Sequence, residues 1–363
     1  MKKNIAVLPG DGVGPEVVEQ GIKILEKIAK IYHHEFTFKY GLIGAVAIEK
    51  TGSPLPDETL NLCQKSDSIL FGAIGDPEYD NDPHAKVRPE QGLLKLRKSL
   101  NLYANLRPVK VFKELIDNSP LKKEKVEGVD LIVVRELTGG IYFGEPRKRI
   151  DKGNTAIDTS IYTKKEIVRV AKLAFNLAMK RNKKVTSIDK ANVLETSRLW
   201  RETVSGVAKD YPGVELTHMF VDNAAMQLVK NPKQFDVILT ENMFGDILSD
   251  ESSVITGSIG LLPSASVGEK YALYEPIHGA FNKAAGKNIA NPIATILSTT
   301  MMLRISFKLE KEATAIENAV ERVLQKGFRT KDLLTTKTPK NKILGTKEMG
   351  ELIISSNFQD EVL

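Results

Sequence analysis

The hydrophobic residues of this chain alternate between two spacings. Runs of β-branched and apolar residues at 4–9, 35–40 and 68–75 predict strands. Between the first two runs, over 16–32, apolar residues recur every three or four positions, which predicts an amphipathic helix. Further strand-like runs follow at 129–136, 184–190, 214–222 and 235–242, with helical patterns at 191–211, 223–232 and 244–253. Repeated junctions from strand to helix predict an α/β fold.

The pattern restarts in the segment LYANLRPVKVF, residues 102–112, and changes again in the glycine-rich segment TGSIGLLPSAS, residues 256–266. At 363 residues the chain is long enough for two domains, and its 42% hydrophobic residues suffice for real cores. We therefore expect domain boundaries near these two segments. A polar stretch at 147–165 interrupts the pattern, and it is either a surface excursion or an arm that reaches a partner subunit.

Charge and composition narrow the class of protein. The 52 basic residues outnumber the 46 acidic ones, but acidic residues lie between them and no block of basic and aromatic residues occurs. This pattern is typical of a mixed, solvated surface and argues against nucleic acid as the partner. The chain has no run of about 20 apolar residues and no signal-peptide pattern, so we expect no membrane partner and a cytoplasmic location. The single cysteine, Cys63, fits a reducing compartment.

The segment PGDGVGPEV, residues 9–17, follows a predicted strand and precedes a predicted helix, as the dinucleotide-binding fingerprint does. Its glycines lie at 10, 12 and 14, however, and Pro15 stands where the third fingerprint glycine belongs. The segment does not match the fingerprint. A tight turn with Pro15 near the start of the helix is the better interpretation.

Four charged residues lie at or just beyond the carboxyl ends of predicted strands: Arg135, Lys190, Asp222 and Asp246. Ligands of open α/β sheets bind at the carboxyl ends of the strands, so these side chains are expected at one rim. An aspartate at such a junction is also a common helix N-cap, and this is the alternative for each aspartate taken alone.

Asp250 follows Asp246 by four residues, so a helix over 244–253 would place both carboxylates on one face. With Asp222 they provide three hard oxygen ligands without His or Cys, which suits Mg²⁺ or Mn²⁺ rather than zinc. Such a metal commonly leaves positions for substrate oxygens, which favours a chelating ligand such as a 2-hydroxy acid.

Three arginines are candidates for binding that acid: Arg97, Arg107 and Arg135. Guanidinium groups bind carboxylates through forked hydrogen bonds, so three of them suit a substrate with two carboxylates. Pairing with surface acids is the alternative, and spacing alone leaves it open for Arg97 and Arg107.

These residues and their surroundings resemble the isocitrate/isopropylmalate dehydrogenase family of metal-dependent decarboxylating dehydrogenases. The similarity covers essentially the whole chain and is most specific in NMFGDILSDESSVITGSIGL, residues 242–261. The other segments that carry it are LPGDGVGPEV, RPEQGLLKLRK, LYANLRPV, RELTGGIYFGEPR, DKANVLETSRLWR, FVDNAAMQL and EPIHGAFNKAAGKNIANP.

The resemblance implies an α/β fold of two domains with a mixed central sheet, which is not the classical Rossmann fold. Residues 1–101 and 256–363 would form a large discontinuous domain with the cofactor adenosine loop. Residues 102–255 would form a middle domain with the dimer interface and the metal and catalytic residues. The active site is expected in the cleft between them. The protein is expected to be a homodimer with shared sites, because Lys190 and Asp222 would serve the site of the other subunit.

The resemblance also implies roles for individual residues. Asp246 and Asp250 would bind Mg²⁺ or Mn²⁺ with Asp222 of the partner subunit, and Tyr142 and Lys190 would be the acid–base pair. Catalytic residues would thus be Tyr142, Lys190 and Asp222. Residues in contact with a small dicarboxylate substrate would be Leu93, Leu94, Arg97, Arg107, Arg135, Lys190, Asn192 and Asp222.

Glu90, Leu93 and Leu94 match the segment that distinguishes the isopropylmalate enzymes of this family. Isocitrate relatives carry a serine and an asparagine here to meet a third carboxylate, whereas adjacent leucines offer an apolar wall to an isopropyl group. The expected reaction is oxidative decarboxylation of (2R,3S)-3-isopropylmalate to 2-oxoisocaproate, in leucine biosynthesis. Lys190 would accept the hydroxyl proton as hydride leaves, and Tyr142 would protonate the carbon after loss of CO₂.

The same comparison gives the cofactor-binding residues Glu90, Asn192, His278, Gly279, Ala280, Lys283 and Asn291. In relatives that use NAD, an aspartate five residues after the histidine of EPxHG receives the adenosine ribose hydroxyls, and Lys283 holds that place here. Relatives that use NADP have lysine there, followed by tyrosine, whereas this chain has Ala284. NAD is expected from the family, and NADP stays open.

Three alternative functions also stay open. A dehydrogenase of tartrate, malate, isocitrate or homoisocitrate would share the metal and the arginines. A regulatory subunit of a related hetero-oligomer is the non-enzyme alternative, and the intact acid–base pair and aspartates argue against it. The basic net charge permits a second role in RNA binding, which would require strongly salt-dependent binding.

Overall fold

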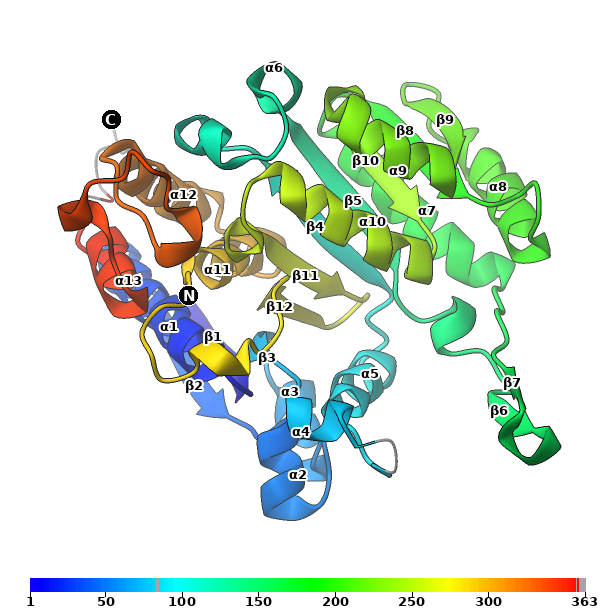
Figure 1. The fold of residues 1–363 in the computed structure, drawn as a ribbon, viewed down its shortest axis with the longest axis horizontal. Coiled ribbons are helices and arrows are strands. Elements are labelled where there is room, and N and C mark those ends of the chain that lie inside the picture. The colour runs from blue at the N-terminus through cyan, green and yellow to red at the C-terminus, as the bar shows by residue number, and fades with distance from the viewer. Residues whose placement is uncertain (83–84, 357, 359–363) are drawn as a thin grey trace. The chain divides into compact units, whose positions relative to one another are not determined.

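The computed structural model describes residues 1–82, 85–356 and 358, and it divides the chain into two units. The first unit contains Met1–Asn101, Glu114–Asn118 and Gly257–Leu363. The second unit contains Leu102–Lys113 and Ser119–Thr256. Each unit has its own strands, helices and buried core (Figure 1).

Five strands of the first unit follow the order β2-β1-β3-β12-β11. The neighbours β2, β1, β3 and β12 run parallel, whereas β11 and β12 are antiparallel. The strands are β1 (Lys2–Gly10), β2 (Glu35–Tyr40), β3 (Ser68–Ala73), β11 (Pro263–Val267) and β12 (Ala272–Pro276). The helices are α1 (Gly14–Tyr32), α2 (Ala45–Thr51), α3 (Asp57–Lys65), α4 (Pro77–Asp80), α5 (Pro89–Ser99), α11 (Ile293–Ile305), α12 (Glu310–Gln325) and α13 (Thr346–Ile354).

Helix α11 lies in the core of the first unit, where it packs against α1, α12 and the strands β11 and β12. Every residue from Ile293 to Leu303 is buried. The hydroxyls of Ser298, Thr299 and Thr300 donate to backbone carbonyls three or four residues earlier, at 2.8, 2.6 and 2.7 Å. These local hydrogen bonds let hydroxyl residues occupy a buried helix.

The glycines of PGDGVGPEV serve close packing. Gly10 and Gly12 have φ angles of +70° and +57°, which residues with a side chain rarely adopt. A Cβ atom on Gly12 would lie 2.0 Å from the carbonyl oxygen of Ala280. The neighbouring Val13 N–H donates to that same oxygen at 2.8 Å. The turn therefore supports the loop that begins at His278.

Five strands of the second unit follow the order β4-β5-β10-β8-β9. Strands β4 and β5 are antiparallel, and the other neighbours are parallel. The strands are β4 (Ala104–Lys110), β5 (Asp130–Glu136), β8 (Lys184–Asp189), β9 (Glu215–Phe220) and β10 (Val237–Thr240). The helices are α6 (Lys123–Val126), α7 (Lys164–Met179), α8 (Glu195–Ala208), α9 (Val221–Lys230) and α10 (Asn242–Ile255).

The helices of the second unit pair off as α7 with α8 and α9 with α10. Helix α7 begins with a capping box, because Thr163 accepts from the Glu166 N–H while the Glu166 carboxylate accepts from the Thr163 N–H. Before it, the polar stretch forms a hairpin of β6 (Lys148–Ile150) and β7 (Thr155–Ile157). Figure 1 shows this hairpin standing away from the helices and strands of its unit.

The mixture of parallel and antiparallel strands confirms the expected α/β fold with a mixed sheet. The hydrophobic pattern placed the strands β1, β2, β3, β5, β8, β9 and β10 and the helices α1, α8, α9 and α10, whereas it predicted no strand at β12 and did not locate the remaining described α-helices. The helix expected at 191–211 begins only at Glu195, because residues from Lys190 onward first form a turn. This turn carries Lys190 and Asn192.

Candidate active site

Helix α10 carries the two candidate metal ligands of the second unit. Asp246 and Asp250 lie one turn apart, and their side chains are 36% and 63% exposed. Arg107 of β4 donates to Asp250 Oδ1 at 2.9 Å, and its Nη2 lies 3.7 Å from Asp246 Oδ1. Arg135 of β5 donates to the same Asp246 oxygen. Two predicted arginines and two predicted aspartates therefore form one cluster.

Both guanidinium groups are buried and are held by neutral partners as well. The Nε of Arg107 donates to Asn105 Oδ1 at 2.7 Å, and its Nη1 donates to Ser249 Oγ at 2.6 Å. The Nε and Nη2 of Arg135 donate to Asn242 Oδ1 at 3.0 and 2.8 Å. These bonds fix the planes of the two guanidinium groups, so binding of an anion there would cost little further conformational freedom.

Asn242 is itself held in place by two hydrogen bonds. Its N–H donates to the Tyr162 hydroxyl at 2.8 Å, and its Nδ2 donates to the Gly139 carbonyl at 3.1 Å. It is 1% exposed and stands at the start of α10. Asn242 thus links α10 to Arg135, a role that the sequence analysis missed.

Tyr142 joins the cluster from a short 3₁₀ turn, Gly140–Tyr142. Its hydroxyl donates to Asp246 Oδ2 at 3.0 Å. Partial burial raises the pKa of the phenol, and the negative charge of Asp246 raises that pKa further. The ring also lies near the Arg135 guanidinium, with 5.7 Å between the guanidinium carbon and the ring centre. Tyr142 therefore keeps its proton at neutral pH and has that proton to donate.

Lys190 and Asp222 form a second group. The Lys190 Nζ donates to Asp222 Oδ1 at 2.7 Å, and this bond lowers the pKa of Asp222. Lys190 follows β8, and Asp222 lies in the first turn of α9. Asn192, two residues beyond Lys190, is exposed. Among the described residues of one chain, no three His, Cys, Asp or Glu side chains converge, so Asp222 does not join Asp246 and Asp250 there.

In the first unit, helix α5 carries Glu90, Leu93, Leu94 and Arg97, whose spacing of three and four residues places them on adjoining faces. Glu90 and both leucines are half-buried, and Arg97 is 8% exposed. The Arg97 Nη2 donates to Glu275 Oε1 at 2.8 Å, whereas its buried Nε has no hydrogen-bond partner among the described residues. The Arg97 guanidinium is therefore held in place by Glu275, and its Nε–H is still available to donate a hydrogen bond.

A hollow of about 370 Å³ in the first unit collects most of the expected adenosine-binding residues. Its lining is Val13, Ser258, Ile259, Gly260, His278, Gly279, Phe281, Ile289, Ala290, Asn291 and Asp332. Ala280 lies buried in the same loop, while Lys283 is exposed and is not part of the lining. The hollow is mostly apolar with a few polar groups, as small-ligand sites usually are.

Asp332 is a second residue that the sequence analysis missed. Its Oδ2 accepts from Asn291 Nδ2 at 3.0 Å and from the Ser258 hydroxyl. Burial lowers the pKa of His278, so its imidazole is neutral at pH 7. Its Nδ1 lies 3.0 Å from the Gly279 carbonyl, which makes Nδ1 the protonated nitrogen and leaves Nε2 as an acceptor.

Comparison with known proteins gives a consistent result. A family model described as isocitrate/isopropylmalate dehydrogenase matches residues 4–353. A 3-isopropylmalate dehydrogenase of Priestia megaterium is 56% identical over 366 residues, covering 100% of this chain and 98% of that protein. A 3-isopropylmalate dehydrogenase of Bacillus subtilis is 54% identical over 361 residues, covering 98% and 99%. The crystal structure of isocitrate dehydrogenase from Methylococcus capsulatus matches with a TM-score of 0.85 at 34% identity, covering 97% and 98%.

The chain belongs to the isocitrate/isopropylmalate dehydrogenase family. The resemblance read from the sequence is therefore confirmed, and so is the family fold in place of a classical Rossmann fold. Members of this family are decarboxylating dehydrogenases that need a nicotinamide cofactor and a divalent metal. Among the described residues, no helix has both the length and the apolar character to cross a membrane.

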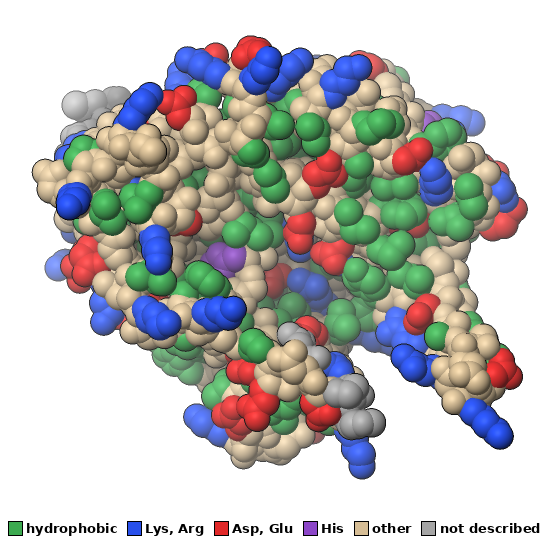
Figure 2. Space-filling view, viewed as in Figure 1, with side chains coloured by type: hydrophobic (Ala, Val, Ile, Leu, Met, Phe, Trp, Pro, Cys, Tyr) green, Lys and Arg blue, Asp and Glu red, His purple; other side chains and the backbone are tan. Residues whose placement is uncertain are grey.

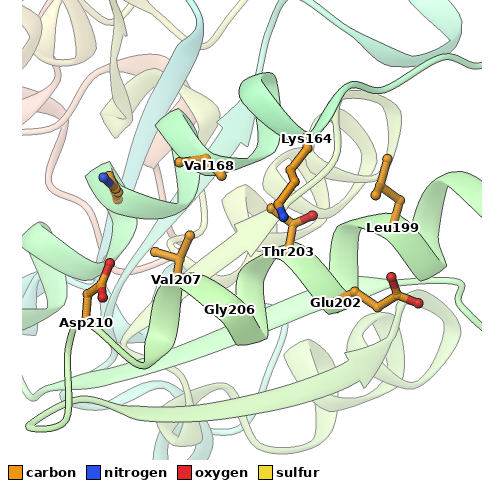
Figure 3. A pocket seen from close by; sticks show the side chains of 9 residues that line it. Lys164, Val168, Leu199, Glu202, Thr203, Gly206, Val207 and Asp210 are labelled. Carbon is orange, nitrogen blue, oxygen red and sulfur yellow. The ribbon is translucent and has the colours of Figure 1, made fainter.

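The surface agrees with the mixed charge pattern of the sequence. On the face drawn in Figure 2, basic and acidic side chains are interspersed among other residues. A second hollow of about 390 Å³ lies between α7 and α8 (Figure 3). Its lining is Lys164, Val168, Lys172, Leu199, Glu202, Thr203, Gly206, Val207 and Asp210. No residue assigned to the chemistry of this dehydrogenase family lines it.

We expect Asn242→Leu to lower kcat/KM by about 100-fold, because it removes the acceptor of two buried Arg135 N–H groups while keeping the branched shape of the side chain. Steady-state kinetics with a 2-hydroxy-acid substrate measures this loss. Asn176→Leu, on an exposed position of α7, is the matched control and should leave kcat/KM unchanged. A folded Asn242→Leu variant with kcat/KM within about twofold of the parent would show that Arg135 is held without Asn242.

Proposed function

We propose that this chain catalyses the oxidative decarboxylation of (2R,3S)-3-isopropylmalate to 2-oxoisocaproate with reduction of NAD, a step of leucine biosynthesis in the cytoplasm. The observation that carries the proposal is the cluster on α10, where two buried guanidinium groups meet two carboxylates and the Tyr142 hydroxyl. The cluster combines anion binding, hard oxygen ligands and a proton donor. The relatives described as 3-isopropylmalate dehydrogenases, at 54–59% identity, support the choice of substrate.

The chemistry of the donors fits a hard divalent cation. Asp246 and Asp250 present carboxylate oxygens from one face of α10, and both carboxylates are accessible. Asp222 of the partner subunit would be the third donor. A bound Mg²⁺ or Mn²⁺ supplies Lewis-acid stabilisation of negative charge on substrate oxygens. Mg²⁺ and Mn²⁺ both prefer such oxygen donors, so the donor set suits either ion.

Each protein group has a separate task in the proposed reaction. Arg107 and Arg135 bind a substrate carboxylate, and Arg97 binds a carboxylate through its remaining donors. Lys190, as a neutral amine, would accept the proton of the C2 hydroxyl, and a bound nicotinamide would supply the acceptor for the hydride from C2, so that a 2-keto acid would result. The C3 carboxylate then departs as CO₂, and Tyr142 donates its proton to C3. Atoms and charge balance, with one proton taken up at C3 for the one released from the hydroxyl.

The half-buried leucines of α5 support isopropylmalate over more polar acids. Leu93 and Leu94 offer an apolar surface that matches an isopropyl group and leaves a third carboxylate without a partner. Tartrate, malate, isocitrate and homoisocitrate are the alternative substrates. A regulatory subunit is disfavoured, because Tyr142, Lys190 and the three aspartates Asp222, Asp246 and Asp250 are all present.

For the adenosine part of the cofactor we propose the hollow around His278, Gly279, Ala280 and Asn291, with Glu90 and Asn192 nearer the nicotinamide. Asp332 supports NAD, because a carboxylate in the lining repels a 2′-phosphate. Lys283 favours the alternative NADP, since an exposed ammonium at the edge of the same loop could meet that phosphate.

The helices α9 and α10 support a homodimer with shared sites. They carry four exposed apolar residues, Met226 (59%), Val229 (49%), Ile247 (59%) and Val254 (54%). Two packed helices with such residues form a surface that a second copy would cover. Asp222 and Lys190 would then serve the site of the other subunit. The β6–β7 hairpin is a further candidate for contact with the partner.

The test of the reaction is the initial rate of reduced-nicotinamide formation with Mg²⁺ at saturating 3-isopropylmalate. We expect kcat/KM for 3-isopropylmalate to exceed that for isocitrate, malate, tartrate and homoisocitrate by at least about 100-fold, since none of these places an isopropyl group on the leucines. A faster rate with one of the other acids would transfer the proposal to that acid. Absence of turnover with all five would contradict the enzyme proposal.

The cofactor is tested with NAD and NADP in parallel. We expect NAD to have the higher kcat/KM, and Lys283→Asp to lower kcat/KM for NADP by about tenfold more than for NAD, through charge repulsion of the 2′-phosphate. Lys287→Asp, an equally exposed lysine of the same loop, is the control. A wild-type preference for NADP would overturn the choice of NAD, and equal effects of the two substitutions would remove Lys283 from cofactor recognition.

We expect Ile247→Glu to convert the dimer to monomers and to abolish activity, because it buries a charge in the proposed interface. Sedimentation equilibrium reports the change in mass. Tyr40→Glu, at a 64% exposed position of β2, is the control and should leave mass and activity unchanged. An active Ile247→Glu monomer would contradict shared sites.

A further inference from the structure

A buried pair outside the proposed mechanism connects α10 to α8. The Ser197 hydroxyl donates to Glu241 Oε1, and the two residues are 0% and 5% exposed. Glu241 is the residue before α10, where an acidic side chain often caps the helix, but its side chain makes no such bond. It extends instead to the first turn of α8. The carboxyl therefore joins two helices at their N-terminal ends.

A second buried acid lies beside this pair. Asp189 is 0% exposed, and its carboxylate accepts from Arg201 Nε and Nη2 at 2.8 and 2.9 Å and from the Ala191 N–H at 3.0 Å. In the sheet, Ile188 of β8 is directly opposite Thr240 of β10. Asp189, the last residue of β8, and Glu241, the residue after β10, therefore lie side by side at the ends of neighbouring strands.

The charged groups nearest to Glu241 have other partners. Asp189 from β8 is compensated by Arg201 from α8, and Arg135 from β5 by Asp246. Burial lowers the pKa of His218 on β9, whose Nδ1 lies 3.9 Å from Asp189, and burial holds the pKa of Tyr162 above its usual value, so both are neutral at pH 7. An ionised Glu241 would therefore be an uncompensated buried charge.

Burial raises the pKa of Glu241 to about 7, against the opposing effect of the Ser197 hydrogen bond and with a further rise from Asp189. Because this folded-state pKa lies above the unfolded value, the neutral carboxyl stabilises the fold fully below the unfolded pKa. That contribution is lost as the pH rises through about 7. The charge of Glu241 thus changes close to neutral pH.

We propose that Glu241 in its neutral form is a positioning residue, which joins the start of α10 to the turn carrying Lys190 and Asn192 through Ser197 and α8. Helix α10 carries Asp246 and Asp250, so one buried contact serves both the oxygen ligands and the base. This inference rests on the proposed function for the role of Lys190, but the contact itself does not. Ionisation of Glu241 places a second negative charge beside Asp189, the residue directly before Lys190. It therefore disturbs Lys190 more than it disturbs Arg107 and Arg135, the proposed ligands of the substrate.

The test compares wild type, Glu241→Gln and the control Glu202→Gln, an exposed position of α8, in kcat and KM from about pH 6 to about pH 8.5. Glutamine keeps the acceptor for Ser197 and stays neutral. We expect the ratio of kcat for Glu241→Gln to kcat for wild type to rise by at least about threefold across this range, with the ratio of KM constant. Glu202→Gln should follow wild type. Parallel kcat profiles for Glu241→Gln and wild type would overturn the proposal.

Ser197→Ala gives an independent readout should the glutamine variant fold poorly. Loss of the Ser197 hydroxyl removes the contact, so kcat should fall at every pH, and it also raises the pKa of Glu241, so the pH-dependent fall in kcat should move to higher pH. A merely structural role would lower kcat without moving the pH profile. Thermal unfolding needs no substrate and separates this inference from the proposed function. If the melting temperature of Glu241→Gln increases relative to that of wild type as the pH rises, this result supports the buried pair, even if 3-isopropylmalate is not turned over. A difference in melting temperature that does not change with pH overturns the inference.

Discussion

The second unit depends on the pairing of two buried guanidinium groups with one helix. Arg107 and Arg135 are 8% and 3% exposed, and a cation so removed from water is tolerated only with close partners. Strands β4 and β5 deliver the arginines, and α10 delivers Asp246 and Asp250. The position of α10 against these strands is therefore set by electrostatics as well as by apolar packing. The side chains that we propose to bind an anionic substrate are therefore the ones that hold this helix in place.

The same constraint explains why the start of α10 is so thoroughly bonded. Asn242 accepts from Arg135 and is fixed by Tyr162, while Glu241 reaches Ser197 on α8. A small displacement of α10 would break a buried charged contact on one side and a buried neutral one on the other. Each broken contact leaves a buried polar group with neither a protein partner nor water. The free energy needed for a movement of even less than an ångström is therefore high. Such rigidity would suit the proposed role of Asp246 and Asp250, since oxygen ligands for a metal must keep their mutual distances.

Features that depend on neighbours in sequence could be predicted, and features that depend on distant partners could not. The period of apolar residues placed α1 and β10 within a few residues, and strand ends identified Arg135 and Asp246 as neighbours at one rim. Asn242, Ser249 and Asp332 were missed, because an amide, a hydroxyl or a loop carboxylate has no local pattern that shows which charge it will meet. Asp222 lies as expected after β9, yet within one chain it meets Lys190 rather than the other aspartates.

That pairing is itself an argument about assembly. Lys190 and Asp222 neutralise each other at 2.7 Å, whereas Asp246 and Asp250 are neutralised by the two arginines, so each group is electrostatically complete within its own chain. In the proposed reaction a substrate carboxylate would compete for the arginines and would thereby free the oxygens of Asp246 and Asp250 for a cation, which would in turn attract a third carboxylate. Binding of substrate, metal and partner would then reinforce one another, because each supplies the charge that another displaces. The exposed apolar residues of α9 and α10 lie on the two helices that carry these aspartates, so the surface that would pair two subunits and the charges that would complete the site belong to the same elements.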